Sequence, residues 1–508
     1  MSKPIYSLLT GAVVFALSQS ALAGTNVFFN PLTQSTAVAS TANHINELNT
    51  PLQVPAGVSQ TNLLSLSKVE ADTNQSILRV PAGTSSSMLD MSAFSDDGRF
   101  LFLPHETPFG AGLSRYDFKT KKTALLFAGD QKGAEGDWTN DYGAFDPARF
   151  TPNGTVIVAE EWAGQGRVIE VLNPFAKPAD IQKRELESIA NVSHEGINFS
   201  EKYNNVIYYI DEWNSGSIYK FVMTTPGDYT KGQTFVLKVD AFNGVASDLW
   251  NDASNASAPR TGAATWVALT DADGNPVTTV SAFKNGEPET DPRVDLTNAL
   301  GGRAAADEVG ATPFGRPEDM EVAKLANGNE VLYIAMTSEA AIYAVEILDD
   351  SKATVRIFAN NTNTPKNLNY PATTAVLNSP DNLAQDALGN IYIIEDAPNS
   401  STVGGDIWFI RDVNNDGTAE SIDHFMSIQV NGSEATGMIF NPAKPTQFVV
   451  SVQHPSSTDL AIAPTGFGDA VWLFDLENVV PPTCVKKVTK TCQVNGNSFA
   501  HMLKAAGN

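Results

Sequence analysis

FTPNGTVIVAEE, residues Phe150–Glu161, holds the pattern on which the fold prediction depends. A turn rich in Pro, Asn and Gly comes first, an apolar β-branched run follows, and two glutamates end the stretch. A glycine-containing turn before a β-branched run is typical of a hairpin whose second strand starts after the turn. The stretch therefore predicts a β-hairpin with acidic residues at the end of its second strand.

The same pattern recurs along the chain. A polar or acidic group also stands just upstream of each turn, as Asp90 does in the first repeat, and these groups are mostly about 50–60 residues apart. The other five segments are Phe94–Glu106, Phe199–Glu212, Ala326–Glu339, Gln385–Asp396 and Phe440–His454. Strand-rich repeats of this length are typical of β-propeller blades. We predict an all-β fold, a six-bladed β-propeller over residues 85–480 with inserted excursions.

One interval between repeats is much longer than the others. Residues 213–315 are rich in Asp, Asn, Gly and Ala, and we interpret them as an insertion that leaves the propeller and returns to it. A pair of β-sandwiches is the alternative. It would not explain why acidic residues recur at the same strand ends.

Composition limits the classes of partner. The chain has 508 residues with 57 Asp+Glu against 33 Lys+Arg, which gives a formal net charge of −24. A surface this acidic repels phosphate backbones and anionic lipids, so we expect no nucleic-acid or membrane partner. Small molecules and cations are the expected ligands, and we expect a monomer.

The two ends of the chain indicate export. Residues 1–23 resemble a secretory signal peptide, with Lys3 before an apolar run that is too short to span a membrane and an Ala-Leu-Ala cleavage site. Residues 24–84 are predicted to be an N-terminal extension. The tail, residues 481–508, holds both cysteines, Cys484 and Cys492, which we expect to form a disulfide in an oxidising compartment. We therefore expect a periplasmic or secreted protein.

Acidic residues should converge in such a propeller. The inner strands surround one channel, and an antiparallel hairpin brings the start of its first strand beside the end of its second. The expected ring comprises Glu106, Glu160, Glu161, Glu195, Glu212, Glu318, Asp381, Glu395, Asp396 and Glu434. Carboxylates at close range need cations to stay ionised, and oxygen-rich sites suit calcium or iron. For any single residue, a solvated loop position is the alternative.

One cation stands among these acids. Arg316 lies two residues before Glu318. A guanidinium can bind two oxygens of a phosphate or carboxylate at once, so anion binding is the favoured interpretation. Neutralising a neighbouring glutamate is the alternative.

A separate stretch, Asp412–Asp423, resembles a calcium-binding loop. Asp412, Asn414, Asp416 and Thr418 occupy ligand positions of an EF-hand-like loop, and Asp423 takes the last one. No helices are predicted beside it. An Asn-Asp-Gly hairpin turn explains the same residues, and both interpretations stay open.

At these residues the sequence resembles the PhoX-type alkaline phosphatases. The most specific motif is Ala305–Glu318 (AADEVGATPFGRPE), and the resemblance covers roughly residues 85–475. Weaker motifs occur in the same order along the chain, namely Glu160–Glu161, His194–Gly196, Ser379–Asn382, Glu434–Gly437 and Gln453–Pro455. The resemblance implies an exported six-bladed propeller that hydrolyses phosphate monoesters with iron and calcium ions.

By motif match, the resemblance also implies roles for individual residues. Arg316 would bind the substrate phosphate, and we also assign His454 to substrate binding. The implied metal ligands are Glu160, Glu161, Glu195, Glu318 and Asp381, to which the repeat argument adds Glu106, Glu395 and Glu434.

Two departures from the family pattern concern iron. Ala159 stands where the family has a cysteine ligand to iron, and the signal peptide lacks the arginine pair with which the family is often exported. Both favour calcium over iron. A calcium-dependent propeller phosphodiesterase, phosphotriesterase or lactonase, and a non-catalytic calcium-binding propeller, remain the alternatives.

Overall fold

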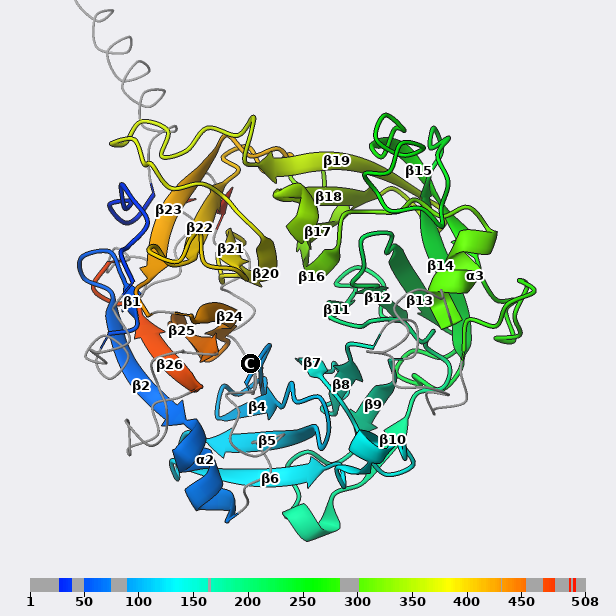
Figure 1. Ribbon diagram of the computed structural model, residues 1–508, viewed down its shortest axis with the longest axis horizontal. Helices are drawn as coiled ribbons and strands as arrows, with labels where there is room; N and C mark the ends of the chain where they lie inside the picture. Colours follow the sequence, from blue (N-terminus) through cyan, green and yellow to red (C-terminus); the bar gives the residue numbers. More distant parts are fainter. Residues whose placement is uncertain are drawn as a thin grey trace, which may run out of the picture.

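The computed structural model is a ring of β-sheets around a central axis (Figure 1). The structure describes residues 27–38, 50–74, 89–162, 166–283, 301–430, 432–453 and 469–479, together with two short paired strands, β27 (Gln493–Val494) and β28 (Asn497–Ser498). The predicted signal peptide, Cys484, Cys492 and His454 lie outside these residues, so those predictions stay predictions.

Each blade is built on an antiparallel meander whose consecutive strands run outward from the axis. The first blade contains β3 (Ala93–Phe94), β4 (Phe100–Pro104), β5 (Gly112–Asp117) and β6 (Lys122–Ala128). The second contains β7 (Phe145–Phe150), β8 (Val156–Glu160), β9 (Val168–Val171) and β10 (Lys183–Glu185). The stretch Phe150–Glu161 thus spans the β7–β8 turn and strand β8, as predicted.

The third and fourth blades share one continuous sheet. The third contains β11 (Ile197–Phe199), β12 (Val206–Ile210), β13 (Ile218–Met223) and β14 (Gly232–Val239). The fourth contains β16 (Pro317–Lys324), β17 (Glu330–Met336), β18 (Ala341–Ile347) and β19 (Lys352–Asn360). Strand β15 (Gly262–Ala268) pairs with both β14 and β19 and joins the outer edges of the two blades. The interval 213–315 therefore contains blade strands as well as excursions, among them helix α3 (Gly301–Glu308).

The N-terminal segment contributes strands to the last two blades. The fifth contains β20 (Pro380–Gln385), β21 (Ile391–Glu395), β22 (Asp406–Arg411) and β23 (Ser421–Ile428), with β1 (Leu52–Gln53) at its outer edge. The sixth contains β24 (Glu434–Asn441), β25 (Lys444–Gln453), β26 (Ala470–Asp475) and, outermost, β2 (Ser59–Ser65). Part of the predicted extension, residues 24–84, is thus built into the sheets and joins the beginning of the chain to its last blade.

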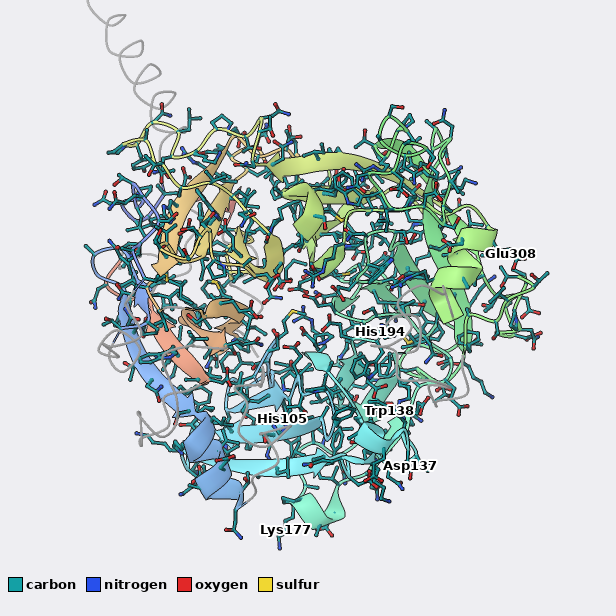
Figure 2. The ribbon with its side chains drawn as sticks, in the orientation of Figure 1. His105, Asp137, Trp138, Lys177, His194 and Glu308 are labelled. Atoms are coloured by element: carbon teal, nitrogen blue, oxygen red, sulfur yellow. The ribbon has the colours of Figure 1, made fainter. Side chains whose placement is uncertain are left out.

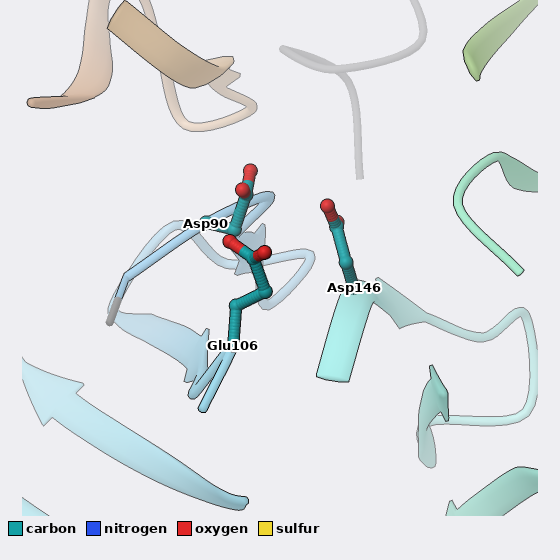
Figure 3. A group of neighbouring side chains, drawn as sticks. All are labelled: Asp90, Glu106 and Asp146. Atoms are coloured by element: carbon teal, nitrogen blue, oxygen red, sulfur yellow. The ribbon is translucent and has the colours of Figure 1, made fainter. Parts of the chain in front are cut away.

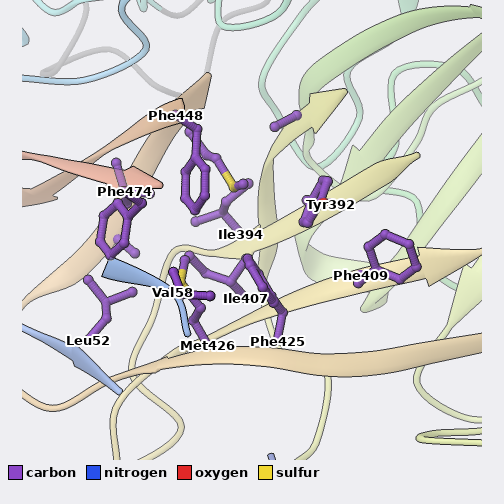
Figure 4. Packing of buried hydrophobic residues seen from close by; sticks show 14 of the residues in the cluster. Leu52, Val58, Tyr392, Ile394, Ile407, Phe409, Phe425, Met426, Phe448 and Phe474 are labelled. Carbon is purple, nitrogen blue, oxygen red and sulfur yellow. The ribbon is translucent and has the colours of Figure 1, made fainter. Parts of the chain in front are cut away.

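Packing between the blades forms the core. Six large apolar clusters each lie between two neighbouring blades, and the one between the sixth and first blades closes the ring. Figure 4 shows the cluster between the fifth and sixth blades, where Tyr392, Phe425 and Phe448 pack together. This arrangement confirms the predicted all-β propeller, and its six interfaces divide it into six blades.

Helices are few and short in the described part of the chain. They are α2 (Leu66–Thr73), which follows β2, α3, and the 3-10 turns η1 (Lys132–Glu135), η2 (Pro178–Asp180) and η3 (Thr337–Glu339). None of the helices placed here has the length and apolar character needed to cross a membrane.

Candidate functional site

The inner strands of three blades are irregular at the same place. The pairing register shifts between Phe145 and Ala148 in β7, between Pro317 and Met320 in β16, and between Pro380 and Leu383 in β20. Each irregularity leaves two residues outside the regular ladder, and the first of the two is an acid, namely Asp146, Glu318 or Asp381. Strand irregularities of this kind re-aim side chains and are common beside functional sites.

These acids meet others from neighbouring blades in three groups. The first acid group is Asp90, Glu106 and Asp146, whose side chains point toward one another in Figure 3. The second acid group is Glu161, Glu195 and Glu212, and the third is Glu195, Glu318 and Asp381. Within each group the carboxylate oxygens that could bind a cation lie within 4.8 Å of one another. Glu195 belongs to two groups, so the second and third are adjacent.

The second residue of two irregularities links one blade to the next. Asp319 accepts a hydrogen bond from the backbone N–H of Leu383 (3.1 Å), and Asn382 accepts one from the N–H of Gly437 (2.5 Å). Arg149 of the second blade also donates to Asp319, at 2.7 Å. Backbone irregularity and blade-to-blade hydrogen bonds therefore hold the acids in place together.

Burial makes the acid groups costly to ionise without cations. Burial, reinforced by neighbouring carboxylates, raises the pKa of Glu195, Asp381, Glu161 and Asp146 well above the ordinary range. The pKa of Glu318 is raised to about 7, first by burial and then by Glu212, although Arg316 opposes the shift. Like charges at this range disfavour ionisation of one another.

Glu318 gives the clearest indication that the site suits a cation. Its side chain is fully buried, and although Nε of Arg316 lies 3.0 Å from one of its oxygens, neither oxygen accepts a well-directed hydrogen bond from a described residue. Buried carboxylates are normally hydrogen-bonded or bound to cations. The site therefore fits a bound cation at Glu318, with Glu195 and Asp381 supplying further oxygens.

Arg316 lies at the edge of the second and third acid groups. Its Nε donates to Glu212 and lies 3.0 Å from an oxygen of Glu318, and its Nη1 lies 3.5 Å from Asp396. Burial lowers the pKa of its guanidinium, but the surrounding carboxylates outweigh that effect and raise it overall. The side chain stays charged and is still 35% exposed, so a ligand can reach it.

The backbone around Arg316 is held on both sides. Arg316 has a φ of 60°, in the left-handed region that non-glycine residues rarely adopt. Its N–H donates to the carbonyl of Trp213 (3.1 Å), its carbonyl accepts from Thr337 (3.1 Å), and the N–H of Gly315 donates to Glu339 (2.8 Å). Such a conformation persists only where the surrounding structure enforces it, which is a common feature of functional sites.

At the end of the second strand of a blade, two adjacent acids point to opposite sides of the strand. Glu161 joins the second acid group, whereas Glu160 points into its own blade and accepts two hydrogen bonds from Arg167, both at 2.7 Å. In the fifth blade, Asp396 faces Arg316, whereas Glu395 accepts hydrogen bonds from Trp408 and the N–H of Asn378, both at 2.8 Å. Side chains alternate along an extended strand, so only one of two adjacent acids reaches the channel.

The structure thus brings together part of the predicted ligand set. The residues assembled in the acid groups are Glu106, Glu161, Glu195, Glu318 and Asp381. Glu160 and Glu395 are instead held by their own blades. Glu434 lies near the channel, where burial and then Asp396, Asp381 and Glu106 raise the pKa of its carboxyl.

Sequence reasoning did not assign Asp90 and Asp146 to the site. Asp90 was only an upstream marker of the first repeat, and its position before the turn was the signal that could have placed it. In the second repeat, Asp141 lies upstream of the turn, as Asp90 does in the first. Asp141 instead accepts hydrogen bonds from the N–H groups of Gly110 and Gly133, both at 2.8 Å, and the strand irregularity five residues later carries Asp146.

Two buried histidines stand beside these acids in the sequence. Both are labelled in Figure 2. His105 bonds Ser114 through Nε2 at 2.9 Å, and His194 packs against the ring of Tyr209. Burial lowers the pKa of both imidazoles to about 3, so both are neutral at physiological pH. Neither belongs to an acid group, and the donor atoms in those groups are all oxygens.

The loop at Asp412 is closed by its own hydrogen bonds. Asp412 accepts from the N–H groups of Asp416 (3.1 Å) and Gly417 (2.9 Å), while both oxygens of Asp423 accept from Arg411 at 2.8–2.9 Å. Asn414 and Thr418 also take part in backbone hydrogen bonds with Asp416. These bonds are those of a turn between β22 and β23, and a calcium ion there stays a prediction.

Comparison with solved structures agrees with the fold. The chain is similar to Pseudomonas fluorescens PhoX, solved in complex with vanadate, a transition state analogue, with 15% sequence identity and a TM-score of 0.58 over 89% of this chain and 99% of that one. It is more weakly similar to a gluconolactonase from Xanthomonas campestris, with 9% identity and a TM-score of 0.40 over 88% of this chain and 96% of that one. Comparison with curated protein sequences gave no match.

The sequence itself matches a family model. The model describes the alkaline phosphatase PhoX and matches residues 106–456, most of the propeller. That range contains Arg316 and all the acid-group residues except Asp90. Among its described residues are three groups of buried or half-buried carboxylates, and this chain belongs to the alkaline phosphatase PhoX family.

Proposed function

We propose that this protein hydrolyses small phosphate monoesters at the second and third acid groups, with calcium bound by their carboxylates. The observation that carries the proposal is the position of Arg316. A partly exposed guanidinium lies against Glu212 and Glu318, at the edge of acids that need cations. A phosphate bound there would contact Arg316 on one side and cations held by the acids on the other.

The donor set favours calcium. The acid groups offer only carboxylate oxygens, which suit hard cations such as calcium. Ala159 is fully buried in the apolar cluster between the second and third blades and offers no donor atom, so nothing replaces the family's cysteine at that position. We therefore propose calcium as the resident cation and assign no role to iron.

The chain's own residues would then position the substrate. Arg316 is oriented by Glu212 and by the backbone contacts at Trp213 and Thr337, so its guanidinium is fixed before substrate arrives. A fixed positive group beside the equatorial phosphate oxygens stabilises the charge that develops there during transfer. Bound cations would supply neutralisation of the phosphate oxygens and activation of water.

The neighbourhood of Arg316 also favours an anionic substrate over a neutral lactone. The test is a panel of p-nitrophenyl phosphate, a phosphodiester, a phosphotriester and a lactone, assayed with calcium. We expect the monoester to have the highest kcat/KM. Faster turnover of a lactone or triester would replace the proposal with one of the alternative enzymes, and no turnover of any substrate would favour a non-catalytic calcium-binding propeller.

Location and assembly belong to the same proposal. We propose that the protein is exported by its N-terminal signal and acts as a monomer on small phosphate esters in the periplasm or outside the cell. The acidic composition supports this, because it disfavours nucleic-acid and membrane partners.

A further inference from the structure

We propose that Arg303, on helix α3 in the long excursion, is a positioning residue that sets the orientation of both Glu212 and Arg316. The inference rests on the proposed function for its kinetic consequences, but not for its effect on cation binding. Arg303 belongs to no acid group and does not contact the channel acids directly. It acts through the two residues on either side of Glu212.

The residue before Glu212 is held by an ion pair with Arg303. Nε and Nη2 of Arg303 donate to the two oxygens of Asp211, at 2.6 and 2.5 Å. Both side chains are almost completely buried. A two-point contact of this kind fixes the plane of the carboxylate as well as its position.

Asp211 passes this constraint to the second acid group through Ser193. Asp211 accepts a hydrogen bond from the N–H of Ser193 at 3.1 Å. The hydroxyl of Ser193 donates to Glu212 at 3.1 Å, and its carbonyl accepts from the N–H of Glu212 at 2.9 Å. The rotamer of Glu212 therefore depends on a network that begins at Arg303.

The residue after Glu212 is held by the same guanidinium. Arg303 lies over the ring of Trp213, with its central carbon 4.9 Å from the ring centroid. The carbonyl of Trp213 accepts the N–H of Arg316, at 3.1 Å. Arg303 thus supports the backbone position of Arg316, whose Nε in turn donates to Glu212.

The other blades show what is particular to this arrangement. In the first two blades, the residue that occupies the place of Asp211 at the end of the second strand is held within its own blade. Glu160 is held by Arg167, and His105 is held by Ser114. In the third blade, the partner of Asp211 comes from the excursion instead. The excursion that carries α3 is therefore part of the functional site's support.

A matched control exists in the fifth blade. Arg411 and Asp423 form another buried two-point ion pair, and Arg411 also lies near an aromatic ring, that of Tyr370 at 5.7 Å. Neither Arg411 nor Tyr370 touches an acid group in the described structure. Replacing Arg411 should cost comparable stability without altering the site.

The experiment compares R303M with R411M, and R303K with R411K in case a methionine variant does not fold. Calcium binding to metal-stripped protein is measured by calorimetry, and inorganic phosphate binding is measured with calcium present. We expect R303M to lose about 10- to 100-fold in calcium affinity, as supporting residues around metal ligands typically do. Lysine keeps the charge but not the two-point contact, so R303K should show a smaller loss. We expect R411M and R411K to bind phosphate as wild type does, and phosphate is the deciding readout for this pair because Arg411 adjoins the predicted calcium loop Asp412–Asp423.

Equal calcium and phosphate affinities in each Arg303 variant and its Arg411 counterpart would overturn the inference. So would the same loss of phosphate affinity in both members of a pair, because it would reflect destabilisation alone. Activity measurements separate failure of the Arg303 inference from failure of the proposed function. If wild type hydrolyses no phosphate ester but R303M still loses calcium affinity, the function is wrong and the positioning role stands.

Discussion

Arg316 combines a rare backbone conformation with a partly exposed charge among buried acids. The contacts at Trp213 and Thr337 enforce its positive φ, and Glu212 and Glu318 orient its side chain. An arginine needed only to neutralise a glutamate would not require this conformation. Together with its exposed guanidinium, this conformation leads us to infer that the backbone presents Arg316 to a ligand.

Replacing Arg316 should therefore affect catalysis more than folding. We expect R316Q to lower kcat/KM for p-nitrophenyl phosphate by about 100- to 1000-fold, the typical effect of losing one donor that stabilises transition-state charge. R99Q is the control, because Arg99 forms an exposed ion pair with Asp117, lies over the ring of Phe100 and belongs to none of the three acid groups. Equal activity of R316Q and R99Q would contradict the role assigned to Arg316.

Glu160 and Glu318 are both buried acids, but the structure gives them different roles. We expect E318Q to weaken calcium binding, because Glu318 lies in the third acid group. We expect E160Q to leave calcium binding intact and to reduce the free energy of unfolding by about 3–5 kcal/mol, because it leaves Arg167 buried without its counter-charge. Calorimetric calcium titration and urea unfolding of both variants test this. A loss of calcium affinity in E160Q equal to that in E318Q would restore Glu160 as a ligand.

At the scale of strands, the sequence predicted the hairpins better than it predicted which acids face the channel. A glycine turn before an apolar run predicted β4, β8 and β21 with an acid at or just after their ends, and each is found there. Adjacent acids such as Glu160 and Glu161 look equivalent in the sequence. Their different roles depend on Arg167, whose contact with Glu160 no local pattern shows.

The inner strands show a second limit of sequence reasoning. Asp146, Glu318 and Asp381 reach their groups because the strand register shifts at each of them. The prolines at 147, 317 and 380 lie beside these shifts and were visible in the sequence. Their effect on register depends on pairing with the second strand, which the local sequence does not determine.

Closure of the ring makes a prediction about β2. Leu64 is fully buried in the cluster between the sixth and first blades. We expect L64A to reduce the free energy of unfolding by about 2–5 kcal/mol. V376A, at an exposed position, should change it by less than about 0.5 kcal/mol. Urea unfolding measures both, and a small effect of L64A would mean that β2 does not contribute to the sixth blade.

At the scale of the whole molecule, the protein carries a formal net charge of −24 and brings acids from several blades together in three groups. The apolar clusters between blades stabilise the ring, but the acids in its centre oppose that stability unless cations or protons neutralise them. Cation binding should therefore be coupled to both stability and pH.

The raised pKa of Glu318 gives the direction of that coupling. Burial, and then Glu212, raise it from 4.5 to about 7 in the metal-free fold. Because the folded state then holds the proton more tightly than the unfolded chain, the stability of metal-free protein should fall as pH rises from about 4.5 to about 7. Calcium replaces that proton, so the rise in Tm caused by calcium should be larger at about pH 8 than at about pH 5. Thermal melts of metal-stripped protein with and without calcium measure this rise in Tm at each pH. An equal or smaller rise at the higher pH would contradict the prediction.

Phosphate release from p-nitrophenyl phosphate by metal-stripped protein, followed as calcium is added, tests the account most directly. The account predicts no turnover in the stripped protein, followed by a saturable rise with calcium that needs no added iron. Full turnover after stripping, or none at any calcium concentration, would contradict it.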